Sequence, residues 1–221
     1  MLKALIFDVD GTLSDTDPVH LKAFQDYLAP YGIAVDRQIY RTAIQGRTNR
    51  AIFGDMFPGL APEELDRLGD EKEALYRRLA PDLPPLAGLD ALIDWAQAQR
   101  LKLAVVTNGP RLNLDHALEA LGLRDRIEIH LAREDVAKGK PDPLPYLTAL
   151  ERLGVTAGEA VVFEDSPSGV RSAAAAGITT FGILTGQTDA ALREAGASAT
   201  IRDYADPALW AWLEAAAQAA A

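Results

Sequence analysis

The chain has 221 residues, a length that suggests one large domain or a core with a smaller insert, at about 100–200 residues per domain. Its composition, 48% hydrophobic and 24% charged residues, is typical of a soluble globular protein and excludes a disordered tail or a fibre. The lack of cysteine excludes disulfides, thiol nucleophiles and iron–sulfur clusters, and the formal net charge of −10 argues against non-specific binding to nucleic acid or to an anionic membrane.

The N-terminal segment predicts a strand over Leu2–Phe7 and shows no sign of export. Its apolar run is interrupted by Lys3 and stops at Asp8, which is too short for the core of a signal peptide. No other apolar run approaches the roughly 20 residues that span a bilayer. We therefore expect a cytoplasmic protein with neither nucleic acid nor a membrane as partner. We expect it to be a monomer or a weak dimer.

The stretch from residue 15 to residue 85 has helical periodicity and few strand-like runs. A stiff, proline-rich segment at 81–85 closes it. We predict that residues 15–85 form a helical cap domain, which leaves the core directly after the first strand and is placed to act as a lid. Its expected helices are Val19–Leu28, Gln38–Ile44, Arg50–Met56 and Glu63–Leu79.

Downstream of the insert, short apolar segments alternate with helix-period segments, which is the α/β pattern. The predicted strands are Leu101–Val106, Ile127–Leu131, Ala160–Phe163 and Ile178–Ile183, and the predicted helices lie at about 88–100, 111–121, 143–154, 167–176 and 210–221. These strands are apolar throughout, as parallel strands are when helices cover both faces. We predict a doubly wound, Rossmann-like core made of residues 1–14 and 86–221, with ligands at the carboxyl ends of its strands.

Polar groups follow the first two predicted core strands. Asp8 and Asp10 come directly after the first strand, and glycine and threonine then let the chain turn near them. The next strand ends in Thr107, Asn108 and Gly109, whose hydroxyl, amide and backbone N–H groups can surround a phosphoryl oxygen without adding charge. Each segment also has a structural reading, since acid pairs and Asn-Gly steps are common in turns.

Two later segments add a cation and a second pair of acids. Lys140 stands before a proline-opened helix, where a lysine is electrostatically unfavourable unless an anion neutralises it. Glu164 and Asp165 end another strand, and Asp165 or Ser166 can cap the helix that follows. The structural alternatives are a surface lysine and an ordinary helix cap.

In the order Asp-x-Asp, Thr, Lys and acid pair, the four segments resemble the motifs of the haloacid dehalogenase-like (HAD) hydrolase superfamily. The insert resembles the small helical cap of the subgroup that holds β-phosphoglucomutases, phosphoglycolate phosphatases and sugar-phosphate phosphatases. The dehalogenases of this superfamily, which attack carbon, lack an acid at the position of Asp10. The resemblance therefore favours phosphoryl transfer.

The resemblance also implies a role for each motif residue. Asp8 would attack phosphorus and form an aspartyl-phosphate, which splits one hard displacement into two easier ones. Asp10 would protonate the leaving oxygen and later accept a proton from water. Thr107 and its neighbouring N–H groups would hold the phosphoryl oxygens, and Lys140 would pair with Asp8 and the phosphate.

Charge arithmetic points to a metal. Two like unit charges at about 4 Å repel by about 4 kcal/mol at an effective dielectric constant of 20, so Asp8, Asp10, Asp165 and a phosphate dianion need more compensation than Lys140 alone supplies. Ligands that are all oxygen indicate Mg²⁺. The resemblance implies that Asp8, Asp165 and the carbonyl of Asp10 bind it, with Glu164 behind them or contacting it through water.

Three residues of the insert are candidates for substrate binding. His20 lies in a stretch similar to the His-x-x-Ala-aromatic segment of the subgroup, although a packing role is an equal alternative. Gly46 and Arg47 lie in a loop that resembles the cap loop that reads the distal part of the substrate, and the alternative is a solvated turn. The mutases carry an arginine where this chain has Asn49, which favours a phosphatase.

These observations predict a Mg²⁺-dependent phosphatase that acts on a small phosphorylated metabolite, a sugar or polyol phosphate. The alternative enzyme is a β-phosphoglucomutase-like hexose phosphomutase. A non-catalytic binding protein built on the same fold is a third reading. It has no physical need for clustered, mutually repelling carboxylates.

Overall fold

The computed structural model describes residues 1–218, which belong to two compact units. One unit combines Met1–Asp15 with the chain from Leu83 onward, and the other is Thr16–Asp82. The sequence-based borders lie after residues 14 and 85. Among residues 1–218, no helix has both the length and the apolar character needed to cross a membrane.

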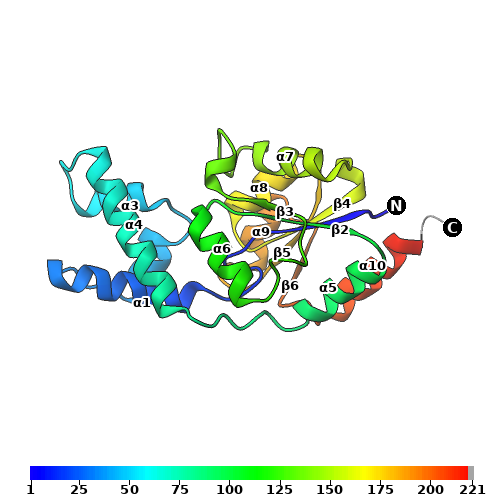
Figure 1. Ribbon diagram of the computed structural model, residues 1–221, viewed down its shortest axis with the longest axis horizontal. Coiled ribbons are helices and arrows are strands. Elements are labelled where there is room, and N and C mark those ends of the chain that lie inside the picture. The colour runs from blue at the N-terminus through cyan, green and yellow to red at the C-terminus, as the bar shows by residue number, and fades with distance from the viewer. Residues whose placement is uncertain (219–221) are drawn as a thin grey trace. The chain divides into compact units, whose positions relative to one another are not determined.

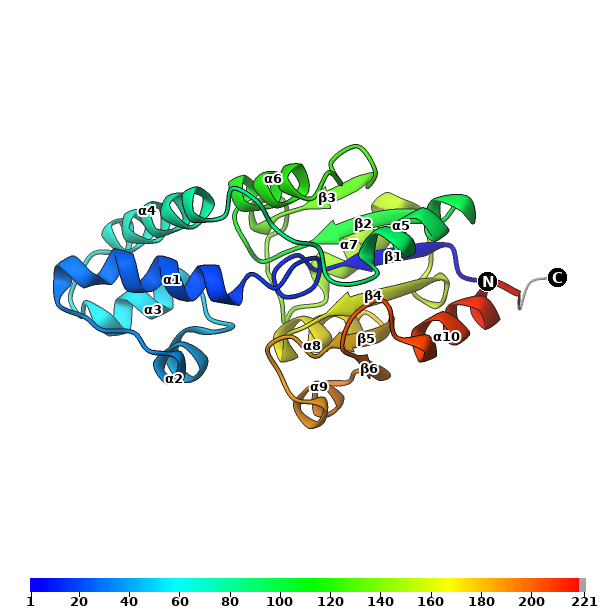
Figure 2. The same cartoon turned by 90° about the horizontal axis from the view of Figure 1, so that it is seen from below.

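The first unit is built on one parallel sheet with the strand order β3-β2-β1-β4-β5-β6. Its central strand β1 pairs with β2 on one side and with β4 on the other, so the strand order reverses between β1 and β4 (Figure 2). This is the doubly wound arrangement, and the predicted fold class is confirmed. The strands are β1 (Ala4–Phe7), β2 (Lys102–Val106), β3 (Ile129–Leu131), β4 (Ala160–Glu164), β5 (Thr179–Ile183) and β6 (Ala199–Ile201).

Helices cover both faces of this sheet, with α7 and α8 on one side and α5 and α10 on the other (Figure 1). Alternate residues of β1 point to opposite faces: Ile6 packs in the cluster that includes Tyr146 of α7, whereas Phe7 contacts Tyr204. Burial on both faces explains the continuous apolar runs. The helices are α5 (Leu89–Ala98), α6 (Arg111–Ala120), α7 (Leu144–Leu153), α8 (Pro167–Ala175), α9 (Asp189–Ala195) and α10 (Pro207–Gln218).

Two short elements, the helix α9 and the strand β6, were not predicted from the sequence. In β6 only Ile201 is fully buried, so its three residues carry no strong apolar signal. In α9 the visible cue is Thr188, whose side chain accepts a hydrogen bond from Ala191 N at the start of the helix. The last three residues of the predicted terminal helix, 219–221, lie outside the described residues.

The second unit is helical, as predicted. Phe24 and Phe53, which are buried, pack together at its centre with their ring centroids 6.0 Å apart. The predicted helix over 38–44 is a short α-helix followed by a π-helical turn at Tyr40–Ile44. The α-helices are α1 (Asp17–Leu28), α2 (Arg37–Ile39), α3 (Asn49–Met56) and α4 (Pro62–Leu79).

A glycine before α5 permits a close approach between two distant segments. Gly88 has φ of +81°, and a Cβ at this position would lie 2.6 Å from Tyr204 C and Ala205 N. Gly122 has φ of +64°, with nothing within 4 Å of such a Cβ.

We expect Gly122→Ala to lower the free energy of unfolding by about 1–2 kcal/mol from backbone strain alone. Gly88→Ala should cost at least about 3 kcal/mol because steric overlap is added.

Urea denaturation of the two variants measures this difference. Equal losses of stability would show that the backbone near Tyr204 yields to the added methyl group, contrary to this expectation.

Candidate active site

The loop after β1 carries the first pair of acids into the centre of the sheet edge. Asp8 is almost fully buried, and its N–H donates to Phe163 O of the neighbouring strand at 3.0 Å. Gly11 has φ of +73°, and a side chain on it would overlap the carboxylate of Asp165. Glycine at this position therefore lets the acid that follows β4 lie directly against the loop that follows β1.

Lys140 joins three strand ends through its ammonium group. Its Nζ donates to Asp8 Oδ1 at 2.7 Å, to Glu164 Oε1 at 2.5 Å and to the carbonyl of Val106 at 2.7 Å. Only 3% of its side chain is exposed, so all three N–H bonds are used inside the protein. The alternative of a surface lysine is excluded. Lys140 lies four residues before the first residue of α7, Leu144.

Glu164 is the fully buried partner of this lysine. Its Oε1 also accepts a hydrogen bond from Tyr146 Oη at 2.8 Å, and its Oε2 accepts from the N–H and the hydroxyl of Ser166. A side chain on Gly169 would overlap its carboxylate. Ser166 Oγ accepts from Gly169 N at 3.0 Å, so the predicted helix cap is present as well.

Sequence reasoning did not identify Tyr146, although a signal for it exists. It lies on the apolar face of α7 with Ala149, Leu150 and Leu153, which marks it as buried. A buried phenol needs a hydrogen-bond acceptor, which Glu164 supplies. Its ring also lies 5.1 Å from Lys140 Nζ.

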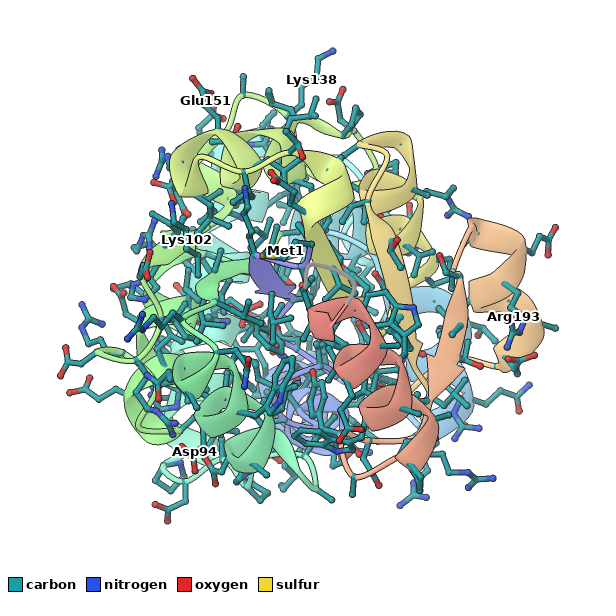
Figure 3. The ribbon with its side chains drawn as sticks, turned by 90° about the vertical axis from the view of Figure 1, so that its right-hand side faces the viewer. Met1, Asp94, Lys102, Lys138, Glu151 and Arg193 are labelled. Atoms are coloured by element: carbon teal, nitrogen blue, oxygen red, sulfur yellow. The ribbon has the colours of Figure 1, made fainter. Side chains whose placement is uncertain are left out.

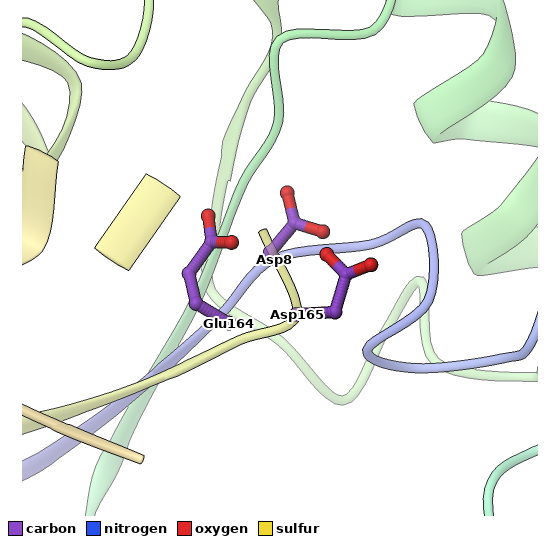
Figure 4. A group of neighbouring side chains, drawn as sticks. All are labelled: Asp8, Glu164 and Asp165. Carbon is purple, nitrogen blue, oxygen red and sulfur yellow. The ribbon is translucent and has the colours of Figure 1, made fainter. Parts of the chain in front are cut away.

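Three carboxyl groups gather at the edge between β1 and β4. One carboxylate oxygen from each of Asp8, Glu164 and Asp165 lies within 4.8 Å of the others, and Figure 4 shows the three side by side. Burial raises the pKa of Asp8 to about 8, with Glu164 and Asp10 adding to the rise and Lys140 opposing it. Burial lowers the pKa of Lys140, but Asp8 and Glu164 outweigh it, so this pKa is raised.

This cluster fits a hard divalent cation, since its donors are all carboxylate oxygens. Positive charge added beside Asp8 would lower its pKa and keep it ionised at neutral pH. Glu164 already accepts four hydrogen bonds, which makes Asp8 and Asp165 the better placed ligands.

The turn after β2 lies next to the same acids. Thr107 Oγ1 accepts from Gly109 N at 2.8 Å, and a Cβ on Gly109 would lie 3.8 Å from Asp10 Oδ2. Asn108 makes a two-way contact with the backbone of Lys140: its Oδ1 accepts from Lys140 N at 2.8 Å and its Nδ2 donates to Lys140 O at 3.0 Å. The side chain of Asn108 thus positions Lys140, and its predicted contact with substrate stays a prediction.

The remaining predicted site residues lie in the helical unit. The ring of His20 is stacked on Tyr76, with centroids 3.9 Å apart, which fits the packing alternative. Arg47 forms an ion pair with Asp55 at 2.7 Å and donates to the carbonyl of Ala43. Gly46 has φ of +74°. Their predicted substrate contacts stay predictions.

His20 also borders a buried charge pair that sequence reasoning missed. Lys72 Nζ lies 2.6 Å from Glu73 Oε1 and 3.4 Å from His20 Nδ1, and Glu73 accepts from Asn49 Nδ2 at 2.6 Å. Burial raises the pKa of Glu73, but Lys72, His20 and Asn49 outweigh it, so the pKa is lowered. The missed signal is the spacing of Lys72 four residues after one buried apolar residue and four before another.

Comparisons with known proteins agree with this geometry. Residues 5–183 match the haloacid dehalogenase-like hydrolase family. The chain belongs to this family. It is 35% identical to a validoxylamine A 7'-phosphate phosphatase from Streptomyces hygroscopicus subsp. limoneus, over 88% of this chain and 92% of that protein. It is 33% identical to a phosphorylated carbohydrates phosphatase from Thermotoga maritima, over 91% and 94% of the two chains.

Among solved structures, CbbY from Rhodobacter sphaeroides in complex with phosphate is similar, with a TM-score of 0.80 and 27% identity over 93% of this chain and 96% of that one. The predicted superfamily and the predicted enzyme class, a phosphoric monoester hydrolase, are confirmed.

Removal of the central ammonium group tests the charge balance of the site. Lys140→Met leaves Asp8 and Glu164 facing each other without a counter-ion, and we expect the free energy of unfolding at pH 7 to fall by about 3–5 kcal/mol. The matched control is Lys138→Met, because Lys138 is exposed at the surface (Figure 3) and its ion pair with Asp142 is worth less than about 1 kcal/mol. Denaturant melts compare the two, and equal effects would contradict the buried-pair assignment.

Proposed function

We propose that the chain is a Mg²⁺-dependent phosphatase that hydrolyses a small sugar or polyol phosphate through an aspartyl-phosphate. The observation that carries this proposal is the contact of Lys140 with both Asp8 and Glu164, beside Asp165 at the carboxyl edge of the sheet. Such a cluster of buried, mutually perturbing charges is typical of a reaction site.

In the first step, Asp8 attacks phosphorus and the bond between phosphorus and the leaving oxygen breaks. Asp10 gives its proton to that oxygen, which leaves as the free alcohol. In the second step, water attacks phosphorus, Asp10 accepts a proton from it, and the bond to Asp8 breaks to release phosphate. Thr107 and the N–H groups of its turn hold the phosphoryl oxygens.

Lys140 keeps Asp8 oriented and offsets negative charge throughout both steps. Mg²⁺, bound by Asp8, Asp165 and the backbone carbonyl of Asp10, would offset the charge of the phosphoryl group. Glu164 holds Lys140 in place rather than binding the metal, which its four accepted hydrogen bonds support.

The substrate class rests on relatives and on the helical unit. Both curated relatives are named for phosphorylated sugar-like compounds. Arg47 and Arg50 are paired with Asp55 and Asp66, and Asn49 donates to a buried glutamate. Asn49 thus stands where the mutases carry the arginine that grips a second phosphate, which supports a phosphatase over a bisphosphate-using mutase. We assign substrate contact in this unit to the predicted residues His20, Gly46 and Arg47.

A panel of sugar and polyol phosphates tests this function through phosphate release. We expect Mg²⁺-dependent release that EDTA abolishes and added Mg²⁺ restores, because Lys140 alone does not balance the acids and the substrate. Isomerisation of β-glucose 1-phosphate without phosphate release would establish the mutase instead. Release that persists in EDTA would contradict the metal assignment.

The covalent step is tested by Asp8→Asn, which keeps the shape of the side chain but makes it a poor nucleophile. We expect kcat to fall by about 10³-fold or more while the melting temperature is retained. Asp94→Asn is the control, because Asp94 lies on the surface of α5 (Figure 3), where it pairs with Arg126. Substantial turnover by Asp8→Asn would refute the aspartyl-phosphate.

A further inference from the structure

Two hydroxyl groups from the far end of the chain bind consecutive carbonyls of the loop that carries Asp8 and Asp10. Thr185, in the turn after β5, donates from Oγ1 to the carbonyl of Gly11 at 2.7 Å. Tyr204, after β6, donates from Oη to the carbonyl of Thr12 at 3.0 Å in a buried contact. Neither residue belongs to a motif found in the sequence.

Both the backbone and the ring of Tyr204 make contacts with neighbouring residues. Its N–H donates to Ala87 O at 2.9 Å, its carbonyl accepts from Trp210 Nε1 at 2.8 Å, and its side chain is fully buried. The ring makes edge contacts with Phe7 and Phe163, whose centroids lie 6.0 and 5.3 Å away. These two phenylalanines directly precede Asp8 and Glu164 in sequence. The Tyr204 hydroxyl is therefore a rigid donor beneath both acid-bearing strand ends.

The loop depends on such outside contacts because most of its own bonds are local. Gly11 N donates to Ser14 O, and Leu13 N donates to Val9 O, so these bonds move with the loop. Gly11 also lies against Asp165, closely enough that a side chain at Gly11 would overlap it. A shift of Gly11 therefore displaces Asp10, its neighbour in sequence, and disturbs the contact with Asp165.

We propose that Thr185 and Tyr204 are positioning residues for phosphoryl transfer, which fix the backbone after Asp10 so that its carboxyl group meets the leaving oxygen. The inference rests on the proposed function. Two buried or half-buried carbonyls need donors in any fold, but here both donors are side-chain hydroxyls from turns distant in sequence, one after β5 and one after β6. An error of about 1 Å in the placement of a catalytic group costs about 10²-fold in rate.

The first test compares two substitutions at the half-buried Thr185. Thr185→Val removes the donor and keeps the shape, and we expect kcat to fall about 10-fold with KM unchanged within about two-fold. Thr185→Ser keeps the hydroxyl, and we expect it to retain kcat within about two-fold. If Thr185 only stabilises the fold, Thr185→Val will lower the melting temperature without lowering kcat at constant KM.

The second test removes the Tyr204 hydroxyl and controls for lost stability. We expect Tyr204→Phe to lower kcat about 10-fold at constant KM. Phe181→Leu is the control. Buried Phe181 packs on Phe163, as Tyr204 does, but its side chain has no hydroxyl that could donate to a loop carbonyl. We expect it to lower the melting temperature at least as much as Tyr204→Phe does and to keep kcat.

The outcomes separate this inference from the function beneath it. If the unmodified chain releases phosphate and both Thr185→Val and Tyr204→Phe keep its kcat, the positioning role is overturned and the phosphatase stands. If Phe181→Leu loses kcat as strongly as Tyr204→Phe, general destabilisation explains the loss and the positioning role is again overturned. If the unmodified chain releases no phosphate from any substrate, the proposed phosphatase function is contradicted, and the positioning role is contradicted with it.

Discussion

The buried ammonium group of Lys140 is the contact on which the edge of the sheet depends. A charge with 3% of its side chain exposed is tolerated only when its N–H bonds are paired, and the three acceptors lie at the end of β2, at the end of β4 and directly after β1. The carboxyl ends of three strands must therefore converge for the lysine to be buried. Asn108, which binds its backbone from both sides, keeps it at that point.

This convergence places acids closer together than a stable surface would. Burial and the neighbouring acids raise the pKa of Asp8, and two glycines make the close packing possible. Gly11 admits the carboxylate of Asp165, and Gly169 admits that of Glu164. Such a cluster of mutually perturbing buried charges is typical of a functional site.

The helical unit also buries a lysine against a carboxylate. Its buried Lys72 and Glu73 form an ion pair with His20 and Asn49 around it, and the ring of Phe24 lies 4.5 Å from Lys72 Nζ. A buried pair of this kind loses stability when either partner is removed. The helical unit, which resembles a substrate-binding cap, therefore also contains a buried ion pair that contributes to its own stability.

The sequence alone predicts the alternation of strands and helices, the helical insert, and the polar residues that follow the strands, because these are local patterns of periodicity and turns. It did not reveal α9 and β6, whose residues are too few to show a pattern. Which side chains contact one another is known from the folded chain and not from the sequence. Tyr146 contacts Glu164 across 18 positions, and Tyr204 contacts Thr12 across 192. Such pairings depend on strand order and on the packing of helices on the sheet, and no local pattern records them.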